Sequence, residues 1–369
     1  MRFYIIAGEA SGDLHAANLV KELTLKRPDA VFRGLGGDLM QHQGVSLLEH
    51  YRNTAFMGFF EVMNNIDKIL AYIDQVKKDI LSWKPDAIIL VDYPGFNLRI
   101  AEFAKQKGFK VFYYISPQLW AWKASRVKKI KRDVDLMFVI LPFEKDFYLK
   151  WEYPVEYVGH PLMDAVENFK NARITFDDDK PVIALLPGSR KQEISKMLPV
   201  MLSVRDAFPG HRFAIAAVNS IDKLFYSNLI GERKCDIVFN QTYALLSQSV
   251  AAVVTSGTAT LETGLFNVPQ VVCYKGSLIS FWIGKKLVNV KYISLVNLIV
   301  DRPLVKELIQ NDFTEANLKN ELQELLTDEE RRASVKAGYI ELKEKIGGAG
   351  ASEKTAMIIL NKMMSQVNK

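Results

Sequence analysis

The sequence predicts an α/β protein with parallel sheets, because short apolar runs alternate along the chain with longer helical stretches. Two further observations divide the chain into halves. Its 369 residues are enough for two domains of about 150 residues each. The alternation also starts again after a charged stretch at Asp177–Lys180. We therefore expect two Rossmann-like domains, 1–170 and 171–346, with the chemistry in the cleft between them, and a C-terminal helix within 347–369.

The first half contains six predicted strands and two long predicted helices. Each strand is a stretch of four or five mostly apolar residues, which is too short for a helix. In the second helix, apolar residues recur at helical spacing, so that one face is buried. The strands are Phe3–Ala7, Val31–Leu35, Ala87–Val91, Val111–Ile115, Leu136–Ile140 and Val155–Val158, and the helices cover about 13–26 and 65–83.

The second half repeats this pattern and ends in helices. A glycine-rich break, Gly347–Gly350, separates the last helix from the helix before it. The predicted strands are Val182–Leu186, Arg212–Ala217, Asp236–Phe239, Ala251–Thr255 and Gln270–Tyr274, and the predicted helices are Lys196–Ala207, Glu315–Ile346 and Ala351–Met364.

The composition excludes several classes of protein. With 49% hydrophobic and 24% charged residues, the chain is neither disordered, collagen-like nor a coiled coil. Its net charge of +6 favours acidic partners such as phosphates or anionic membranes. Cys235 and Cys273 lie at no metal or disulfide spacing, which is typical of a reducing cytoplasm. Phe3–Ile6 is too short for a signal peptide, and no stretch approaches the ~20 apolar residues of a membrane span, so we expect a soluble or membrane-surface protein.

Ligands of parallel α/β sheets bind beyond the carboxyl ends of the strands, so the residues after each strand are the candidates for function. The run GEASGD at 8–13 follows the first strand. Its glycines and the helix behind them favour an anion or a sugar hydroxyl. It is neither G-x-G-x-x-G nor a P-loop, which argues against a nicotinamide enzyme or an NTPase. An ordinary tight turn with Asp13 near the helix start explains the run about equally well.

Asp92 follows the third strand and is the candidate general base. An acid at the end of so apolar a run as AIILV is partly desolvated, which raises its pKa. A carboxylate in that position can take the proton of a hydroxyl group. A turn-forming aspartate before Pro94 is the alternative interpretation.

Two turns of the second half are typical of nucleotide binding. Gly188-Ser189-Arg190 follows a buried strand and precedes a helix, so its backbone donors and its cation suit a diphosphate. Ser256-Gly257-Thr258 repeats this design, with Glu262 one helical turn after Thr258. Such a carboxylate can accept hydrogen bonds from ribose hydroxyls.

Two stretches combine aromatic and basic residues. Trp120 and Trp122 precede a basic run at 123–132, which suits an anionic lipid or phosphate surface or a solvated helix face. Nothing else supports nucleic-acid binding. The stretch 274–300 contains no acidic residue and predicts either an interfacial membrane patch or a buried core helix. The patch would consist of Phe281, Trp282, Lys285 and Lys286.

Taken together and in order, these motifs resemble one family, the lipid A disaccharide synthases, which are bacterial glycosyltransferases of the GT-B fold. The matching runs span almost the whole chain. They are AGEASGD at 7–13, MG at 57–58 with EV at 61–62, D-x-P-x-FN at 92–97, SPQ-x-WAW at 116–122, LPFEK at 141–145, GH at 159–160, LLPGSR at 185–190, SGTA at 256–259 with Glu262, and SL-x-NL at 294–298.

The resemblance implies a reaction. The family transfers 2,3-diacylglucosamine from UDP-2,3-diacylglucosamine to the 6-hydroxyl of 2,3-diacylglucosamine 1-phosphate (lipid X), with inversion at the anomeric carbon. The products are UDP and the β-1,6-linked disaccharide 1-phosphate. The resemblance implies no cofactor and no metal, because GT-B transferases usually neutralise the leaving diphosphate with helix ends and cations.

The resemblance also implies roles for individual residues. Asp92 matches the acid taken as the base, but members often carry a second acid where this chain has Gly95, and that acid is the alternative base. The residues expected to hold UDP are Gly188, Ser189, Arg190, Ser256, Gly257, Thr258, Glu262 and Asn297. Those expected on the acceptor side are Glu9, Ser11 and Asp13.

The expected partners are the two acylated sugars and the anionic cytoplasmic face of the inner membrane of a Gram-negative bacterium, without nucleic acid. The helix within 347–369 is expected either to pack on the N-terminal domain or to be exchanged between subunits, since family members can exchange C-terminal segments. A homodimer is therefore a further expectation. Two kinds of alternative remain. One is a related enzyme, either a UDP-N-acetylglucosamine epimerase or a transferase with another acceptor. The other is a UDP-sugar sensor or membrane scaffold without turnover.

Overall fold

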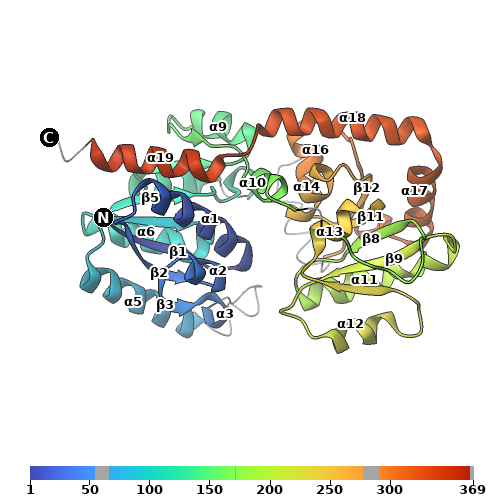
Figure 1. Ribbon diagram of the computed structural model, residues 1–369. Coiled ribbons are helices and arrows are strands. Elements are labelled where there is room, and N and C mark those ends of the chain that lie inside the picture. The colour runs from blue at the N-terminus through green and yellow to red at the C-terminus, as the bar shows by residue number, and fades with distance from the viewer. Residues whose placement is uncertain (55–65, 123, 171, 277–290, 366–369) are drawn as a thin grey trace. The chain divides into compact units, whose positions relative to one another are not determined.

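A computed structural model describes residues 1–54, 66–122, 124–170, 172–276 and 291–365 (Figure 1). The chain forms two compact units, one made of Met1–Asp164 with Ala349–Lys369 and the other of Ala165–Gly348. The C-terminal helix therefore belongs to the same unit as the N-terminus. None of the helices in the described ranges is both long and apolar enough to cross a membrane.

The first unit contains a seven-stranded parallel sheet with the strand order β3-β2-β1-β4-β5-β6-β7. Ile6 pairs with Leu35 on one side and with Leu90 on the other, so β1 is a central strand. The strands are β1 (Arg2–Ala7), β2 (Val31–Gly36), β3 (Ser46–His50), β4 (Ala87–Val91), β5 (Lys110–Tyr114), β6 (Leu136–Val139) and β7 (Glu156–Tyr157).

Helices cover both faces of this sheet. Alternate strand residues such as Tyr4, Ile6 and Leu90 pack against α5, α6 and α8, because side chains along a strand point to opposite faces. The helices are α1 (Ala10–Lys26), α2 (Asp38–His42), α3 (Tyr51–Thr54), α5 (Ile66–Trp83), α6 (Pro94–Gln106), α7 (Leu119–Trp122), α8 (Val127–Asp133), α9 (Pro142–Leu149), α10 (Leu162–Glu167) and α19 (Ala351–Met364).

The C-terminal helix α19 packs against α1 in the first unit (Figure 1). Asp164 accepts hydrogen bonds from the backbone N–H groups of Gly350 at 2.5 Å and Ser352 at 3.2 Å. Both donors lie at the start of α19, where backbone N–H groups have no partner within the helix. The cap therefore joins α19 to the segment that leads out of the first unit.

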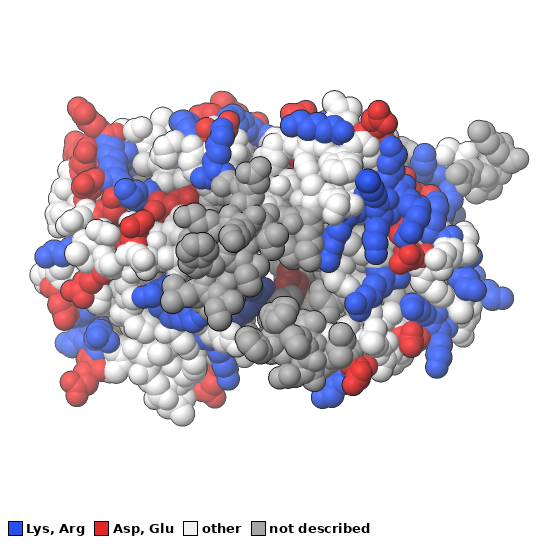
Figure 2. Space-filling model, turned by 180° about the vertical axis from the view of Figure 1, so that it is seen from behind, with Lys and Arg blue, Asp and Glu red and all other residues white. Residues whose placement is uncertain are grey.

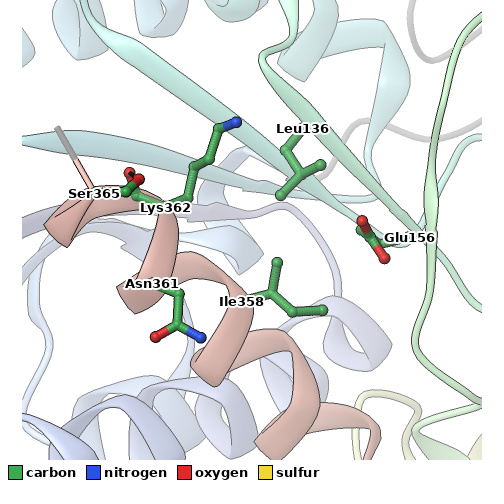
Figure 3. Close-up of a pocket in the computed structure, with 6 residues that line it drawn as sticks. All are labelled: Leu136, Glu156, Ile358, Asn361, Lys362 and Ser365. Carbon is green, nitrogen blue, oxygen red and sulfur yellow. Dashed lines mark hydrogen bonds between the residues drawn. The ribbon is translucent and has the colours of Figure 1, made fainter.

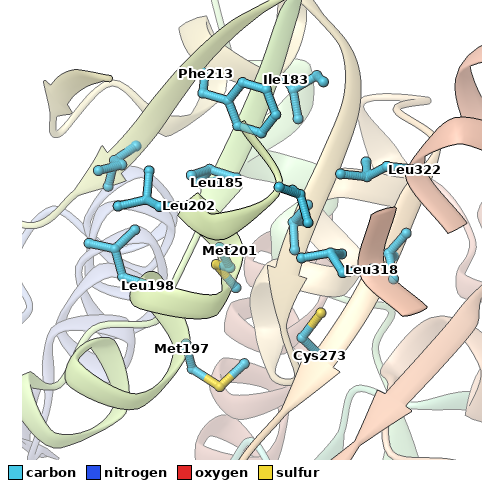
Figure 4. Close-up of a cluster of buried hydrophobic side chains, with 14 of the residues drawn as sticks. Ile183, Leu185, Met197, Leu198, Met201, Leu202, Phe213, Cys273, Leu318 and Leu322 are labelled. Atoms are coloured by element: carbon cyan, nitrogen blue, oxygen red, sulfur yellow. The ribbon is translucent and has the colours of Figure 1, made fainter. Parts of the chain in front are cut away.

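The second unit contains a six-stranded parallel sheet with the strand order β10-β9-β8-β11-β12-β13. Its core on one face lies between β8, α11 and α17 and includes Leu185, Met201 and Leu322 (Figure 4). The strands are β8 (Val182–Leu186), β9 (Arg212–Ala217), β10 (Asp236–Phe239), β11 (Ser249–Thr255), β12 (Gln270–Tyr274) and β13 (Lys306–Ile309). The helices are α11 (Lys191–Ser203), α12 (Lys223–Ile230), α13 (Thr242–Ser247), α14 (Thr258–Leu265), α16 (Leu295–Val300), α17 (Glu315–Thr327) and α18 (Glu329–Ile346).

The structure confirms the parallel α/β class and corrects several elements. The prediction of one helix over Glu315–Ile346 was wrong, because Asp328 is extended and its side chain accepts the N–H of Arg331, which starts a new helix. The edge strands β3 and β13 were missed, since their sequences SLLEH and KELI are too polar to form an apolar run. The helix predicted from Lys196 begins at Lys191 instead.

Candidate active site

Each sheet has one point at which the strand order reverses. In the first unit it lies between β1 and β4, and in the second between β8 and β11. All pairs are parallel, so the loops after neighbouring strands lie at the same edge of the sheet. Ligands of open α/β sheets bind at such points. The reversals bring together loop 8–13 with Asp92, and separately Gly188–Arg190 with Ser256–Thr258.

Asp92 lies at the carboxyl end of β4 in a strained turn. Asp92 has a φ of 45° and Tyr93 a φ of 49°, and two successive left-handed residues other than glycine are unusual. Hydrogen bonds hold this turn. The backbone N–H of Asp92 donates to the carbonyl of Tyr114 at 3.0 Å. The carbonyl of Asp92 accepts from the Tyr113 hydroxyl at 2.5 Å and from Asn97 Nδ2 at 2.8 Å.

The side chain of Tyr93 joins this turn to loop 8–13. A Cβ atom on Gly8 would overlap the Tyr93 ring, so the ring lies directly against the backbone of the first loop. On its other side the ring stacks on Phe96 at 5.4 Å between centroids. Gly8 is therefore required for close approach of the two loops, and this approach places Asp92 near Glu9.

The surroundings of Asp92 favour its protonated form. Burial, together with the negative charge of Glu9, raises the pKa of Asp92 from 3.8 to about 7. A carboxyl group with a pKa near neutral pH is well suited to accept a proton from a hydroxyl group. Ser11 donates from Oγ to Glu9 Oε1 at 2.8 Å, so Glu9, Ser11 and Asp92 are neighbours at one edge of the sheet.

Asp13 has a different environment from the other predicted acceptor residues. Its buried carboxylate accepts the backbone N–H groups of Gly37, Leu39 and Met40 at 2.7, 3.0 and 3.2 Å. These donors surround the start of α2, whose backbone N–H groups need such partners. In this structure Asp13 therefore holds the loop after β2 in place beside loop 8–13.

The motif analysis gave no role to Glu144, a second buried acid. Its carboxylate accepts the N–H groups of Ile140 at 3.1 Å and Leu141 at 2.9 Å, and Trp120 Nε1 at 3.3 Å. Burial raises the pKa of Glu144 to about 7, and the charge of Asp92 contributes to this shift. The rule that selected Asp92, an acid shortly after a buried strand, also applies to Glu144.

The Gly188-Ser189-Arg190 loop leads from β8 into α11, and Arg190 is the N-cap residue of that helix. Gly188 has a φ of 106°, a conformation that favours glycine. The backbone N–H of Ser189 donates to Glu193 Oε2 at 3.2 Å. Ser189 and Arg190 are both exposed.

The second turn of this unit precedes α14, with Gly257 as its N-cap residue. Ser256 Oγ donates to the carbonyl of Ile293 at 2.7 Å, which ties this turn to the segment before α16. Glu262 is half-buried, its pKa is raised by burial, and it accepts the hydroxyl of Tyr243 at 3.0 Å. Tyr243 is a neighbour that the sequence did not indicate, because it lies 19 residues away along the chain.

Asn297 is bonded entirely within the second unit in this structure. Its Nδ2 donates to the carbonyl of Val305 and to Glu307 Oε1, both at 2.9 Å, and its Oδ1 accepts the N–H of Val305 at 2.9 Å. Glu307 also accepts from Ser294 and from the backbone of Ile293. Asn297 is thus buried, and it is linked to the second turn through Glu307 and Ile293, because Ser256 donates to the carbonyl of Ile293.

Other predicted features lie elsewhere. The patch of Phe281, Trp282, Lys285 and Lys286 is outside the described residues. Within the described ranges, no group of three or more His, Cys, Asp or Glu side chains is arranged to hold a metal ion. A pocket of about 360 Å³ in the first unit lies beside α19 at the amino ends of β6 and β7, whereas the predicted site residues follow the carboxyl ends of strands (Figure 3). It contains none of the predicted site residues and is lined by Leu136, Glu156, Ile358, Asn361, Lys362 and Ser365.

Sequence comparison finds relatives along the whole chain. Residues 3–360 match the family described as lipid-A-disaccharide synthetase. A lipid-A-disaccharide synthase of Syntrophus aciditrophicus (strain SB) is 38% identical over 370 residues, covering 96% of this chain and 96% of the relative. The enzyme of the same name from Myxococcus xanthus (strain DK1622) is 39% identical over 370 residues, covering 97% of each chain.

Comparison with solved structures supports the fold. UDP-GlcNAc 2-epimerase from Neisseria meningitidis, solved with bound UDP-GlcNAc, matches with a TM-score of 0.68. The match covers 98% of this chain and 100% of the epimerase chain, at 15% sequence identity. At that identity the likeness shows the fold alone, which is the GT-B arrangement of two parallel-sheet α/β domains.

Proposed function

Because the chain belongs to the lipid-A-disaccharide synthetase family, and is therefore a glycosyltransferase, we propose that its substrates are UDP-2,3-diacylglucosamine and lipid X. The acceptor's 6-hydroxyl oxygen attacks the anomeric carbon of the donor sugar while the bond from that carbon to UDP breaks. The hydroxyl proton passes to Asp92. One displacement inverts the anomeric carbon and gives UDP and the β-1,6-linked disaccharide 1-phosphate.

The observation that carries this proposal is the environment of Asp92. Its carboxyl group ends a buried strand at the reversal point of the first sheet, and its pKa of about 7 lets it gain and lose a proton near neutral pH. Glu9 and Ser11 lie beside it and would bind hydroxyl groups of the acceptor. Asp13 would contribute to the acceptor site indirectly, because its carboxylate holds the loop between β2 and α2.

The donor would bind at the reversal point of the second sheet. Backbone N–H groups of Gly188 and Ser189, with the cation of Arg190, would hold the diphosphate and stabilise the negative charge that develops as UDP leaves. Ser256, Gly257 and Thr258 form the neighbouring turn at the start of α14. Glu262 would accept hydrogen bonds from the ribose hydroxyls. Asn297 would hold this turn in place indirectly, through the hydrogen bonds that link Glu307, Ile293 and Ser256.

The acyl chains of both substrates would remain in a membrane, so the enzyme would work at the cytoplasmic face of the inner membrane. Basic side chains gather on one face of the first unit (Figure 2). That unit also carries three exposed lysines on α8, namely Lys128, Lys129 and Lys131. Such a surface suits anionic lipid headgroups. The proposal includes a homodimer, whose mass light scattering of the purified protein would detect.

A turnover assay tests the proposed reaction. Purified protein is mixed with both substrates in detergent micelles without added metal, and UDP and the disaccharide are measured by mass spectrometry. We expect both products in equal amounts, and turnover at least about 10²-fold lower in Asp92→Asn with UDP binding retained. Asp146→Asn, which changes an exposed acid on α9, is the matched control and should keep wild-type turnover.

The other outcomes would each contradict part of the proposal. UDP without the disaccharide would show that the acceptor is a different hydroxyl compound. UDP binding without any turnover would favour a sensor or scaffold. Wild-type turnover by Asp92→Asn would assign the proton transfer to another group.

A further inference from the structure

The loop proposed to bind the diphosphate contains a carboxylate from the chain itself. Glu193 lies in the first turn of α11, and its Oε2 accepts the backbone N–H of Ser189 at 3.2 Å. The backbone N–H of Arg190 also stabilises the charged form of the Glu193 carboxylate. The N–H of Ser189 is one of the donors proposed to hold the diphosphate, and the N–H of Arg190 is the next donor along the same loop.

Gly188 shows how closely this carboxylate is fitted to the loop. A Cβ atom on Gly188 would collide with the carboxylate of Glu193, so the carboxylate lies directly over the Cα of the glycine. The loop is therefore shaped around an anionic group of three atoms placed against its backbone. A phosphate group has the same requirements, namely a negative charge, oxygen acceptors and close approach to backbone N–H groups.

A capping box alone explains only part of this geometry. In a capping box, a glutamate at the third helical position accepts the N–H of the N-cap residue, which here is Arg190. Glu193 additionally accepts the N–H of Ser189, which lies outside the helix. Burial raises the pKa of Glu193 and outweighs the opposing effect of these donors and of the Arg190 charge. The charged carboxylate is therefore held at a cost in solvation.

We propose that the Glu193 carboxylate occupies the position of a phosphate group in the Gly188–Arg190 loop, and that the diphosphate of UDP must displace it to bind. This inference rests on the proposed donor site. Glu193 then weakens the affinity for ligands that carry phosphate groups, and leaves the affinity for the nucleoside part unchanged. The same competition helps UDP to leave after transfer, because the carboxylate can return to the donors that the product vacates.

Glu193→Gln tests the proposal, since glutamine keeps the shape and an acceptor oxygen but removes the charge. A charge-assisted hydrogen bond is about twice as strong as a neutral one, so we expect UDP to bind about tenfold more tightly to the variant. Calorimetric titration of the full chain with UDP, inorganic pyrophosphate and uridine separates the two parts of the ligand. Pyrophosphate should follow UDP, and uridine should bind both proteins equally.

Two further variants make the result decisive. Glu193→Ala also removes the competing carboxylate and should tighten UDP binding, so the test stands even if one variant folds poorly. Glu315→Gln changes an exposed first-turn glutamate on α17 and should alter none of the three affinities.

Three results would overturn the inference: unchanged or weaker UDP binding by both Glu193 variants, an equal change for UDP and uridine, or a similar effect of Glu315→Gln. If the wild-type protein bound neither UDP nor uridine, the proposed donor site itself would be refuted. That failure is distinct from a failure that appears only in the variants.

Discussion

Replacing Asp92 by Asn should stabilise the folded protein at alkaline pH, although it removes the proposed catalytic base. The reason is the raised pKa of this carboxyl group, which means that the fold favours its neutral form. Asparagine is neutral at every pH and has nearly the same shape. It also tolerates the left-handed backbone that Asp92 adopts at a φ of 45°.

The size and sign of the effect follow from the two pKa values. Below pH 3.8 Asp92 is protonated in both the folded and the unfolded chain, so its ionisation does not affect stability. Between 3.8 and about 7 the folded state holds a proton that the unfolded state has lost, and stability falls as the pH rises. Above pH 7 the charged carboxylate costs at most about 4 kcal/mol, since each tenfold change in proton affinity is worth ~1.4 kcal/mol. The advantage of the asparagine variant should grow over this range and then level off.

Urea unfolding between pH 5 and 8.5, followed by tryptophan fluorescence, measures this difference. Four of the five tryptophans belong to the unit that contains Asp92, so most of the signal reports on that unit; they are Trp83, Trp120, Trp122 and Trp151. Asp146→Asn changes an exposed acid and is the control, and its unfolding free energy should stay within about 0.5 kcal/mol of the wild-type value. The reasoning would be refuted if Asp92→Asn gave the same difference at pH 5 and pH 8.5, or were less stable than wild type at pH 8.5.

Two more predictions concern the acceptor side and the membrane. Glu9→Gln removes a negative charge that raises the pKa of Asp92, so the acid limb of the kcat/KM profile should move to lower pH. Burial is the larger cause, so the limb should stay above pH 3.8, and an unmoved limb would mean that Asp92 is not the titrating base. Most of the protein should sediment together with anionic vesicles at low salt, and salt of about 1 M should release it from the vesicles. Equal recovery in the supernatant with and without vesicles would contradict membrane binding.

The local pattern of the chain was sufficient to predict the class of fold and where most of the central strands lie. Buried parallel strands appear as short continuous apolar runs, so the residues that follow them can be read directly. This is how Asp92, Arg190 and the turn at Ser256 were selected. The edge strands β3 and β13 were not predicted, because one side of an edge strand faces solvent and its sequence contains both polar and apolar residues.

The residues alone thus indicated which chemical groups follow which strands, together with the family they resemble. The surroundings of those groups became visible only in the folded chain. The strand order brings loop 8–13 beside Asp92, although some 80 residues separate them, and this contact together with burial sets the pKa of the acid. In the folded chain the side chain of Asn297 also points into the interior of the second unit, and the carboxylate of Glu193 lies over the Cα of Gly188. Solvation and side-chain direction depend on neighbours that are distant in the chain, and these neighbours are defined only once the sheets have formed.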